Sequence, residues 1–384
     1  MKNICVVTGT RAEYYLLKPL LIRIKNEKSL KLSLIVTGMH LSPEFGLTYK
    51  EILSDGFSID KKVEILLSSD TSVGVSKAIG LGLLSFSEVL PSLRPDILVL
   101  LGDRFELLSI AVAALISKIP IAHIHGGEKT EGAFDDAIRH SITKMSNIHF
   151  VATEEYKKRV IQLGENPLTV FNVGGLGVDN IRNVKLLKDS ELEKKFKFKF
   201  SKKNILVTFH PVTLESDSIV QFKAILSAIK QINSFESFLV IFTYPNADTS
   251  GRVLIEEINN FCKEHKNTIC IKSFGEQAYL SVLKKVDFVI GNSSSGLLEA
   301  PSFNTPTINV GNRQKGRIEA KSVISVSADK VEILKGINII FSSAFKKRLR
   351  FNKNPYDNGN SSSKIIKTLK KIKIKTTKKE FFDL

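Results

Sequence analysis

The stretch HIHGGEKTEGAFDDAIRH, from His123 to His140, gathers side chains that could do chemistry. It holds three of the chain's seven histidines and four carboxylates. Such a set could bind a metal ion, transfer protons, or form a polar loop without a chemical role. Proton transfer requires acids and bases, such as carboxylates and imidazoles, held within reach of the reacting atoms.

A zinc site in this stretch would require His123, His125 and a carboxylate to converge. Strand alternation places the two histidines on one face, so the spacing allows it. His123, however, lies among isoleucines at the end of an apolar run, which favours a structural histidine with a buried hydrogen bond. Lys129 and Glu131 are typical of a solvated loop. The metal interpretation is therefore the least favoured, and we expect no metal.

Six other polar clusters also follow short apolar runs. They are TGTRAEYY (8–15) with Arg11, TGMHL (37–41) with His40, GDRFE (102–106) with Asp103 and Arg104, FHP (209–211) with His210, GNSSSGLLEAPS (291–302) with Ser293, Ser294, Gly296 and Glu299, and GNRQKGR (311–317) with Arg313 and Arg317. Ligands of open parallel sheets bind outside the carboxyl ends of the strands, so these clusters mark a candidate site.

Two of the clusters suit phosphate. Arg11 lies at a strand-to-helix turn beside helix N–H groups, a combination that favours an anion. In GNSSSG, small residues let a phosphate approach backbone N–H groups, and serine hydroxyls add donors. Glu299 is expected to face the same cleft. Asp103 has a second interpretation, because an aspartate at that point can simply cap the following helix.

The elements that must position these side chains alternate along the chain. Each apolar run is followed by a segment with helical spacing; the runs include CVVTGT, LSLIVTG, ILVLLGD, IPIAHIHGG, IHFVAT and TVFNVGG. This alternation predicts βαβ units and a parallel sheet buried on both faces. After a glycine-rich turn and a lysine-rich stretch, the alternation resumes at NILVTFHP. We therefore expect an α/β protein with two Rossmann-like domains and an active site in the cleft between them.

Composition narrows the class of protein. The chain has 384 residues, 43% hydrophobic and 25% charged, which is ordinary for a globular protein. No apolar run reaches the ~18 residues of a membrane span, and the N-terminus lacks the features of a signal peptide, so we expect a cytoplasmic protein. Three cysteines without metal spacing fit reduced thiols. The Walker A and GxGxxG patterns are absent, which argues against the usual ATPase and dinucleotide sites.

The net charge of +17 raises the question of nucleic acid. Much of the excess lies in residues 185–203 and 364–379. In the second stretch apolar residues recur at helical spacing and leave the lysines on a solvated face. No basic motif interleaved with aromatic residues is present. We expect neither a nucleic-acid nor a membrane partner.

Nine motifs together resemble the UDP-N-acetylglucosamine 2-epimerase family, most closely its hydrolysing branch, which supplies N-acetylmannosamine for sialic acid synthesis. They are TGTRAEY, TGMHL, LGDRFE, HIHGGE, DDAIRHSITK, TEEYKKRVIQLGE, FHPVTLE, GNSSSGLLEAPS and INVGNRQKGR, in this order between residues 4 and 325. The resemblance implies a fold like that of GT-B glycosyltransferases, a homodimer or homotetramer, and no cofactor. It implies an N-terminal domain over 1–178, a UDP-binding domain over 179–355, and a basic tail over 356–384. Within the tail, Ser363–Ile374 is expected to pack on the first domain.

The resemblance also implies a reaction. A base removes H2 of UDP-GlcNAc while UDP leaves from the opposite face, which gives 2-acetamidoglucal. Water then adds at C1 and a proton returns to C2 from the other face, which gives N-acetylmannosamine. Two faces require at least two proton-transfer groups. Departure of UDP requires positive charge and helix N-termini around the diphosphate.

By the same resemblance, Asp103 and Asp135 are the catalytic carboxylates, with Asp136 adjacent and easily confused with Asp135. Arg139 and His140 match a binding pair. His210 matches a catalytic or phosphate-contacting histidine. The remaining positions implied to bind substrate are Arg11, His40, Arg104, Ser293, Ser294, Gly296, Glu299 and Arg313.

One departure from the family affects the chemistry. In many relatives the histidine motif reads His-x-Glu-Gly-Gly-Glu and its first glutamate is catalytic, whereas this chain has His125 there. Either His125, with a pKa that proteins can tune near neutrality, or Glu128 takes that role. Four other functions stay open: a hydrolysing epimerase of UDP-2,4-diacetamido-2,4,6-trideoxyglucose for legionaminic-type acids, a non-hydrolysing UDP-GlcNAc 2-epimerase, a GT-B glycosyltransferase, and a basic RNA-binding protein.

Overall fold

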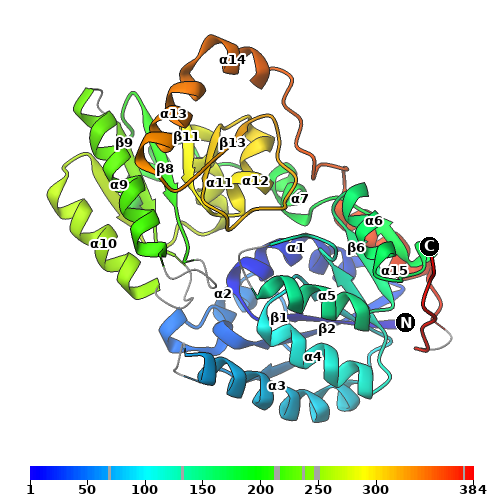
Figure 1. The fold of residues 1–384 in the computed structure, drawn as a ribbon. Helices are drawn as coiled ribbons and strands as arrows, with labels where there is room; N and C mark the ends of the chain where they lie inside the picture. The colour runs from blue at the N-terminus through cyan, green and yellow to red at the C-terminus, as the bar shows by residue number, and fades with distance from the viewer. Residues whose placement is uncertain (68–70, 131–133, 212–216, 236–237, 246–250, 375–376) are drawn as a thin grey trace. The chain divides into compact units, whose positions relative to one another are not determined.

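The computed structural model describes residues 1–67, 71–130, 134–211, 217–235, 238–245, 251–374 and 377–384. The chain forms two compact units. Unit 1 comprises Met1–Glu128, Asp135–Asn180 and Asn358–Leu384, and unit 2 comprises Lys129–Phe134 and Ile181–Asp357. Each unit is built on its own parallel sheet (Figure 1).

Unit 1 alternates strands and helices from its first residues. Its elements are β1 (Lys2–Thr8), α1 (Arg11–Asn26), β2 (Leu30–Thr37), α2 (Tyr49–Ser54), β3 (Lys61–Val63), α3 (Ser72–Leu93), β4 (Ile97–Leu101), α4 (Phe105–Ile116), β5 (Ile121–Ile124), α5 (Asp135–Met145), β6 (Ile148–Val151), α6 (Glu154–Gln162), β7 (Val170–Asn172) and α15 (Ser361–Lys371), with 3₁₀ turns at Gly38–Leu41, Pro43–Phe45 and Pro167–Thr169. The helix α7 (Leu176–Asn183) contains the boundary between the units.

The sheet of unit 1 has the strand order β3-β2-β1-β4-β5-β6-β7, and all its pairs are parallel. The order reverses between β1 and β4, where Ile4 pairs with Ile97. The carboxyl ends of these two strands therefore form the topological switch point, the usual place for a ligand in an open α/β sheet.

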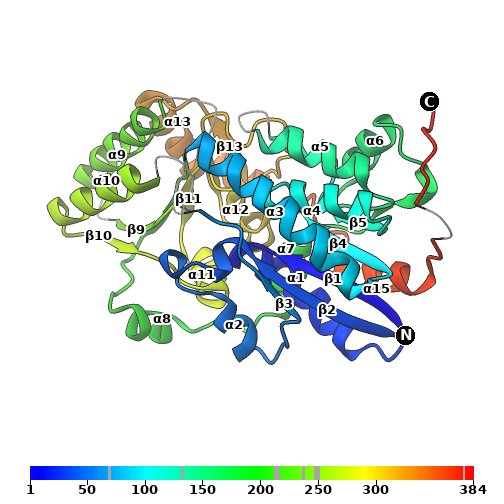
Figure 2. The ribbon, with the colours of Figure 1, turned by 90° about the horizontal axis from the view of Figure 1, so that it is seen from below.

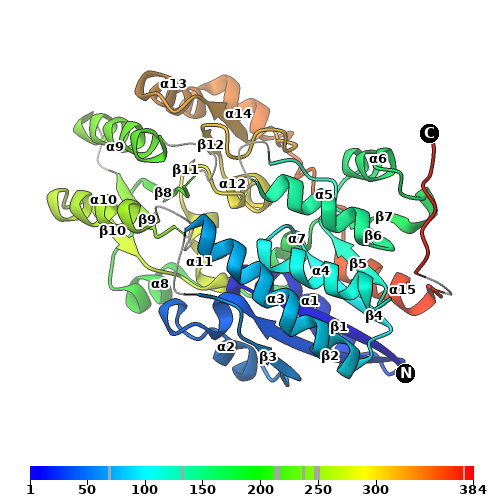
Figure 3. The same ribbon diagram turned by 60° about the horizontal axis from the view of Figure 1, so that its bottom comes forward.

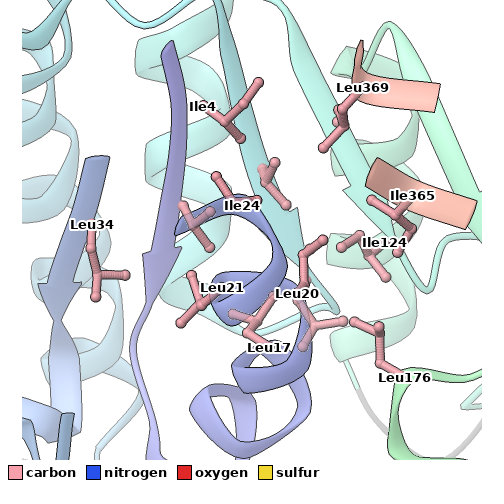
Figure 4. Packing of buried hydrophobic residues seen from close by; sticks show 14 of the residues in the cluster. Ile4, Leu17, Leu20, Leu21, Ile24, Leu34, Ile124, Leu176, Ile365 and Leu369 are labelled. Carbon is pink, nitrogen blue, oxygen red and sulfur yellow. The ribbon is translucent and has the colours of Figure 1, made fainter. Parts of the chain in front are cut away.

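Helices cover both faces of this sheet, which explains why its strands are apolar on both sides. On one face Ile4 and Val6 pack with residues of α1 and α15, and on the other Cys5 and Val7 pack with residues of α3, α4 and α5 (Figure 2). Ile365 and Leu369 of α15 are fully buried beside Leu20 (Figure 4). The C-terminal helix is thus part of the core of unit 1.

The helix α3 is long and apolar enough to cross a membrane by length and composition. The sequence analysis looked for an uninterrupted apolar run and therefore did not identify this helix, because polar residues interrupt it. Its mean hydropathy nevertheless stays high. Its residues Ala78, Phe86 and Leu90 are buried, and it packs along α4. Only 28% of its apolar window is buried within the protein, and one such helix alone is weak evidence for a membrane span.

Unit 2 repeats the alternation. Its elements are α8 (Asp189–Phe196), β8 (Asn204–Thr208), α9 (Ser218–Phe235), β9 (Leu239–Thr243), α10 (Gly251–Glu264), β10 (Thr268–Ile271), α11 (Glu276–Lys285), β11 (Phe288–Gly291), α12 (Ser295–Leu298), β12 (Thr307–Val310), β13 (Val323–Val326), α13 (Lys330–Phe341) and α14 (Ser343–Leu349), with a 3₁₀ turn at Ala300–Phe303.

The parallel sheet of unit 2 has the order β10-β9-β8-β11-β12-β13, so its switch point lies between β8 and β11. One face packs against α9, α10 and α13, and the other against α8 and α11 (Figure 3). The expected two α/β units with parallel sheets are confirmed.

Candidate active site

The first loop of the unit 1 site joins β1 to α1. Thr10 caps α1: its hydroxyl accepts from the N–H of Glu13, and Glu13 Oε2 accepts from the N–H groups of Gly9 and Thr10, at 2.8 and 3.2 Å. The N–H groups of Gly9 and Thr10 are therefore occupied by a carboxylate of the same chain, whereas an anion beside Arg11 and the first N–H groups of α1 stays a prediction. Arg11, the first residue of α1, is half-buried, and within the described residues its guanidinium has no hydrogen-bond or ion-pair partner.

Two buried glutamates lie together beneath this loop. A Cβ built on Gly9 would lie 3.5 Å from Glu13 Oε2 and 3.8 Å from Glu106 Oε1. Burial raises the pKa of Glu13 to about 7, opposed by Arg104 and the two backbone hydrogen bonds and reinforced by Glu106. Arg104 donates to both oxygens of Glu106, each at 3.2 Å. Arg104, expected to bind substrate, is thus already engaged by a carboxylate of its own helix.

His40 has no exposed surface. Its Nε2 lies 3.0 Å from Thr8 Oγ1 and its Nδ1 lies 2.7 Å from Thr48 Oγ1. Burial lowers the pKa of its imidazole to about 4, so the ring is neutral at neutral pH. With both nitrogens occupied, His40 fits a role in holding the loop in place better than the expected direct contact with substrate.

Arg139 joins the ends of two strands in unit 1. Its side chain is 1% exposed and donates to Asp103, to the main-chain oxygen of Glu128 at 2.9 Å, and to Asp136 Oδ1 at 3.1 Å. Asp103 follows β4 and Glu128 follows β5, whereas Asp136 lies in the first turn of α5. The interpretation of Asp103 as a helix cap is wrong, because residue 104 occupies the cap of α4 and makes no side-chain cap bond. Arg139, expected to bind substrate, is thus engaged by groups of unit 1, and its contact with substrate stays a prediction.

The two neighbouring aspartates at the start of α5 have different surroundings. Asp136 accepts from Arg139, and its Oδ2 lies 3.4 Å from His140 Nε2. Asp135, the residue expected to be catalytic, is half-buried in the same turn. The Nδ1 of His140 is buried without a hydrogen-bond partner among the described residues, and burial lowers the pKa of this histidine. The Nδ1 of His140 is therefore enclosed by the protein and unpaired among the described residues.

His125 and Glu128 form a hydrogen-bonded pair. His125 Nδ1 lies 2.7 Å from Glu128 Oε1, and the side chains are 10% and 3% exposed. The turn between them requires Gly127, since this residue has φ +77° and a Cβ there would lie 2.5 Å from the oxygen of Tyr156. The Nε2 of His125 faces the N–H of Leu176 at 3.5 Å. His125 and Glu128, the two alternatives considered from the sequence, therefore form one hydrogen-bonded pair.

His123 is structural, as the sequence favoured. It is fully buried, with Nδ1 3.1 Å from Thr143 Oγ1 and Nε2 2.7 Å from the oxygen of Gly102. Burial lowers its pKa to about 3. His125 lies beyond the end of β5 with φ +66°, so strand alternation does not govern its direction. In the part of the chain that the structure describes, no three His, Cys, Asp or Glu residues form a metal site. Glu131 lies outside the described residues.

In unit 2 a fully buried asparagine holds the loop after β8. The N–H of His210 donates to Asn292 Oδ1 at 2.7 Å, and Asn292 Nδ2 donates to the oxygen of His210 at 2.7 Å. The main-chain oxygen of Asn292 accepts from Arg313 at 3.1 Å and from Gln314 at 2.8 Å. The loops after β8, β11 and β12 therefore meet at this one residue.

The serine loop follows Asn292 and ends in α12, which is only one turn long. Ser295 Oγ lies 2.5 Å from Tyr279 OH and 3.2 Å from Ser293 Oγ. Burial, with a smaller contribution from Glu299, raises the pKa of Tyr279 to about 12, so the tyrosine stays a neutral donor. Ser294 is half-buried, and among the described residues its hydroxyl has no partner in the protein. The half-buried Glu299 follows α12 directly.

Gly296 has a structural reason to be glycine. A Cβ there would lie 2.6 Å from Thr307 Cγ2, and Thr307 Oγ1 donates to the oxygen of Gly296 at 2.9 Å. Gly296 thus has a packing role, in which it lets α12 lie close to β12, and its expected contact with substrate stays a prediction.

Several residues that shape both sites were not selected from the sequence. Glu13, Glu106, Asn292 and Ser295 lie inside the quoted motifs but look like ordinary helix or loop residues. Their local signal was a polar residue directly after a strand or in the first turn of the next helix. Gln314 lies in the quoted motif GNRQKGR as well, whereas Tyr279 is placed by tertiary packing and no local pattern marks it.

Comparisons with known proteins agree with this geometry. A family model described as UDP-N-acetylglucosamine 2-epimerase matches residues 22–370. The chain is 44% identical to a Campylobacter jejuni protein named GDP/UDP-N,N'-diacetylbacillosamine 2-epimerase (hydrolyzing), over 100% of this chain and 99% of that one. It is 41% identical to the Escherichia coli polysialic acid biosynthesis protein P7, over 100% and 97% of the two chains.

Solved structures share the fold. A Staphylococcus aureus MnaA–UDP complex has a TM-score of 0.83 at 19% identity and covers 96% of each chain. A Neisseria meningitidis UDP-GlcNAc 2-epimerase bound to UDP-GlcNAc has a TM-score of 0.82 at 19% identity and covers 96% of this chain and 99% of that one. The GT-B-like α/β fold expected from the sequence is thereby confirmed. The chain belongs to the UDP-N-acetylglucosamine 2-epimerase family.

Proposed function

We propose that this protein is a hydrolysing 2-epimerase that converts a UDP-linked 2-acetamido sugar and water into UDP and the free 2-epimer. The observation that carries the proposal is the arrangement around Arg139. This buried guanidinium ties Asp103, after β4, to the turn of Glu128 and His125, after β5. Two groups able to transfer protons are thus held at adjacent strand ends, which the two faces of the sugar require.

The chemistry balances with these groups alone. One group accepts the proton from C2, the C2–H electrons form the C1=C2 double bond, and the C1–O bond breaks with its electrons on the UDP oxygen. A second group then returns a proton to C2 on the opposite face, water adds its hydroxyl at C1, and a third group accepts the proton that the water loses; exchange with solvent restores all three groups. We assign proton removal from C2 and proton return to C2 to Asp103 and Asp135, the carboxylates expected from the family, and acceptance of the proton that water loses at C1 to the His125–Glu128 pair, which stands in the position of the family glutamate.

Within that pair we assign proton transfer to His125 and orientation to Glu128. Glu128 is the more deeply buried, and its main chain already holds Arg139. An imidazole oriented by a carboxylate on one nitrogen can exchange a proton at the other. His125→Ala should lower kcat by 10²-fold or more, whereas Glu128→Gln, which preserves the hydrogen bond, should cost about 10-fold. The opposite order in steady-state kinetics would transfer the role to Glu128.

The UDP site is proposed for unit 2. Ser293, Ser294 and Arg313 offer hydroxyl and guanidinium donors for a diphosphate, and Glu299 offers a carboxylate for ribose hydroxyls. Arg11, His140 and His210 supply further donors. With two such units, an active site in the cleft between them stays a prediction, as does a homo-oligomer of two or four chains.

UDP-GlcNAc, which would give N-acetylmannosamine for sialic acid synthesis, is the first proposed substrate. A second substrate is favoured by the names of two relatives. The C. jejuni protein at 44% identity and a Legionella pneumophila protein at 38% identity are both called N,N'-diacetylbacillosamine 2-epimerases. That sugar is the 2,4-diacetamido-2,4,6-trideoxyglucose considered from the sequence.

One assay separates these functions. The purified protein is incubated with each UDP-sugar in ²H₂O, and products are followed by ¹H and ³¹P NMR. Free UDP with the free 2-epimer, deuterated at C2, is the expected result. A UDP-linked epimer would indicate the non-hydrolysing reaction. Turnover of only the diacetamido sugar would select the second substrate, and no turnover of either would refute the proposal.

A further inference from the structure

The deeply buried side chain of Asn292 adds one more pair of hydrogen bonds to the ladder between two strands of unit 2. The pairing of β8 and β11 ends at Thr208 and Gly291. One step further, the side-chain amide of Asn292 replaces a backbone peptide, because it accepts from the N–H of His210 and donates to its oxygen, both at 2.7 Å. The N–H of Asn292 itself donates to the oxygen of Thr208 at 3.2 Å. Both strand ends are thus locked by one side chain.

The same residue reaches the other loops. Its main-chain oxygen accepts hydrogen bonds from Arg313 at 3.1 Å and from Gln314 at 2.8 Å. Ser293 is the next residue of the chain. We propose that Asn292 is a positioning residue that sets the place of His210 relative to Arg313 and the serine loop. This inference rests on the proposed function, in which these groups surround the leaving diphosphate.

Only an amide carries both halves of this interaction at this length. A carboxylate of the same shape accepts from the N–H of His210 but cannot donate to its oxygen, and it places two acceptors against each other. A protonated carboxylic acid restores one acceptor and one donor. Asn292→Asp is therefore a variant whose defect depends on pH, and Asn292→Ser, which lacks both groups at the required reach, is one whose defect does not.

A matched control exists in the same sheet. Asn309 of β12 is 2% exposed and donates to Ser325 Oγ at 2.9 Å, without contact to His210 or Arg313 among the described residues. Asn309→Asp makes the same chemical change at similar depth. It measures the general cost of a buried aspartate in unit 2.

The experiment compares wild type, the two Asn292 variants and Asn309→Asp by turnover of the UDP-sugar, by UDP binding in calorimetry, and by NMR of the histidine Cε1–H signals. The His210 signal is assigned from its loss in His210→Gln. At about pH 8, Asn292→Asp should lower kcat by on the order of 10- to 100-fold and weaken UDP binding by on the order of 10-fold, because it displaces groups proposed around the diphosphate, and both deficits should shrink toward about pH 5.5. Asn292→Ser should show a deficit independent of pH. Both should displace the His210 signal, and Asn309→Asp should not.

The outcomes that overturn the inference are distinct from failure of the proposed function. A wild-type rate and an unmoved His210 signal in the Asn292 variants would overturn it, as would an equal loss of rate in Asn309→Asp. If Asn292→Asp does not fold, as judged by circular dichroism, Asn292→Ser decides by the same readouts. If the wild type turns over neither UDP-sugar, the proposed function fails, and the His210 signal alone decides the role of Asn292.

Discussion

The two units share an architecture but differ in what they bury. Among the described residues, every buried aspartate, glutamate and arginine belongs to unit 1: Glu13, Glu106, Glu128, Arg139, Glu165 and Asp179. In unit 2 the buried polar side chains are hydroxyls, amides and the single imidazole of His210. Burying a charged side chain costs free energy unless the charge is paired. The six buried carboxylate and guanidinium side chains of unit 1 therefore indicate a role that offsets this cost.

The difference corresponds to different roles for the two units. Arg139 gathers the strand ends of unit 1 through charge, whereas Asn292 gathers those of unit 2 through neutral amide and carbonyl groups. Proton transfer needs titratable groups held in one geometry, while a UDP leaving group needs donors that do not change their charge with pH. We therefore expect unit 1 to set the pH dependence and unit 2 to set nucleotide affinity.

The largest effect should come from removing the guanidinium of unit 1. Arg139→Met leaves Asp103 and Asp136 without their buried cation, which should lower the free energy of unfolding by about 3–5 kcal/mol. It should also lower kcat by on the order of 10²-fold, because Asp103 loses its position. Urea unfolding and steady-state kinetics measure both effects.

The matched change in unit 2 is Gln314→Met, which removes one neutral donor to the oxygen of Asn292 while Arg313 still donates to it. Its cost should be only about 0.5–1.5 kcal/mol. If Arg139→Met and Gln314→Met lower the free energy of unfolding equally, the two units do not differ in whether a charged or a neutral side chain holds their strand ends.

The second-largest effect distinguishes residues that catalyse the reaction from residues that bind UDP. Asp103→Asn and Asp135→Asn should each lower kcat by about 10²-fold or more with little change in UDP affinity. Ser294→Ala should instead weaken UDP binding, by about 5- to 15-fold for one hydrogen bond to a charged group. Calorimetry with UDP and initial rates distinguish the two. Wild-type rates in both aspartate variants would remove these carboxylates from the mechanism.

Sequence patterns predicted the fold well because strand–helix alternation and apolar strands are local signals. They also located the strand ends at which Asp103, His125, His210 and Ser293 lie. The hydrogen bond between His125 and Glu128 could not be predicted, since it depends on a left-handed residue at position 125. Nor could the partners of Arg139 and His40, because these bonds form between loops far apart in the chain. The sequence favoured ligand contact for both; each is buried and bonded to neighbouring loops, and contact with substrate stays a prediction.

The third effect concerns pH. The pKa of Glu13 rises, chiefly through burial, from 4.5 to about 7 in the folded protein. The folded state therefore holds a proton that the unfolded state releases between these values, and stability falls as pH rises from about 4.5 to about 7. The displacement corresponds to about 3 kcal/mol. Glu13→Gln keeps an acceptor for the N–H groups of Gly9 and Thr10, and should flatten this slope in urea unfolding curves measured across that window.

Glu13→Asp does not serve as the control, because it moves the carboxylate away from those N–H groups. The exposed Glu380→Gln is matched in chemistry and should leave the slope unchanged. A slope as steep in Glu13→Gln as in the wild type would assign it to another group of unit 1.

The smallest effect tests charge far from the site, where the chain's last residues meet unit 1. Glu165 is 2% exposed and accepts from His149 at 2.9 Å, Lys379 at 2.7 Å and Lys144 at 3.0 Å. Burial alone would raise the pKa of Glu165, but His149 and Lys379 lower it, to about 2. Burial lowers the pKa of His149, so it is a neutral donor at neutral pH. Lys379→Met therefore removes one of two cations, and since Lys144 remains, the loss should be about 1 kcal/mol.

The exposed neighbour Lys378→Met should change stability by less than about 0.5 kcal/mol. The N–H of Phe382, which donates to the oxygen of Gly164 at 3.0 Å, gives a local probe, because its hydrogen exchange should quicken in Lys379→Met only. If both variants match the wild type in stability and exchange, the buried charge at Glu165 does not hold the C-terminal segment. The division between the units would then apply only near the site.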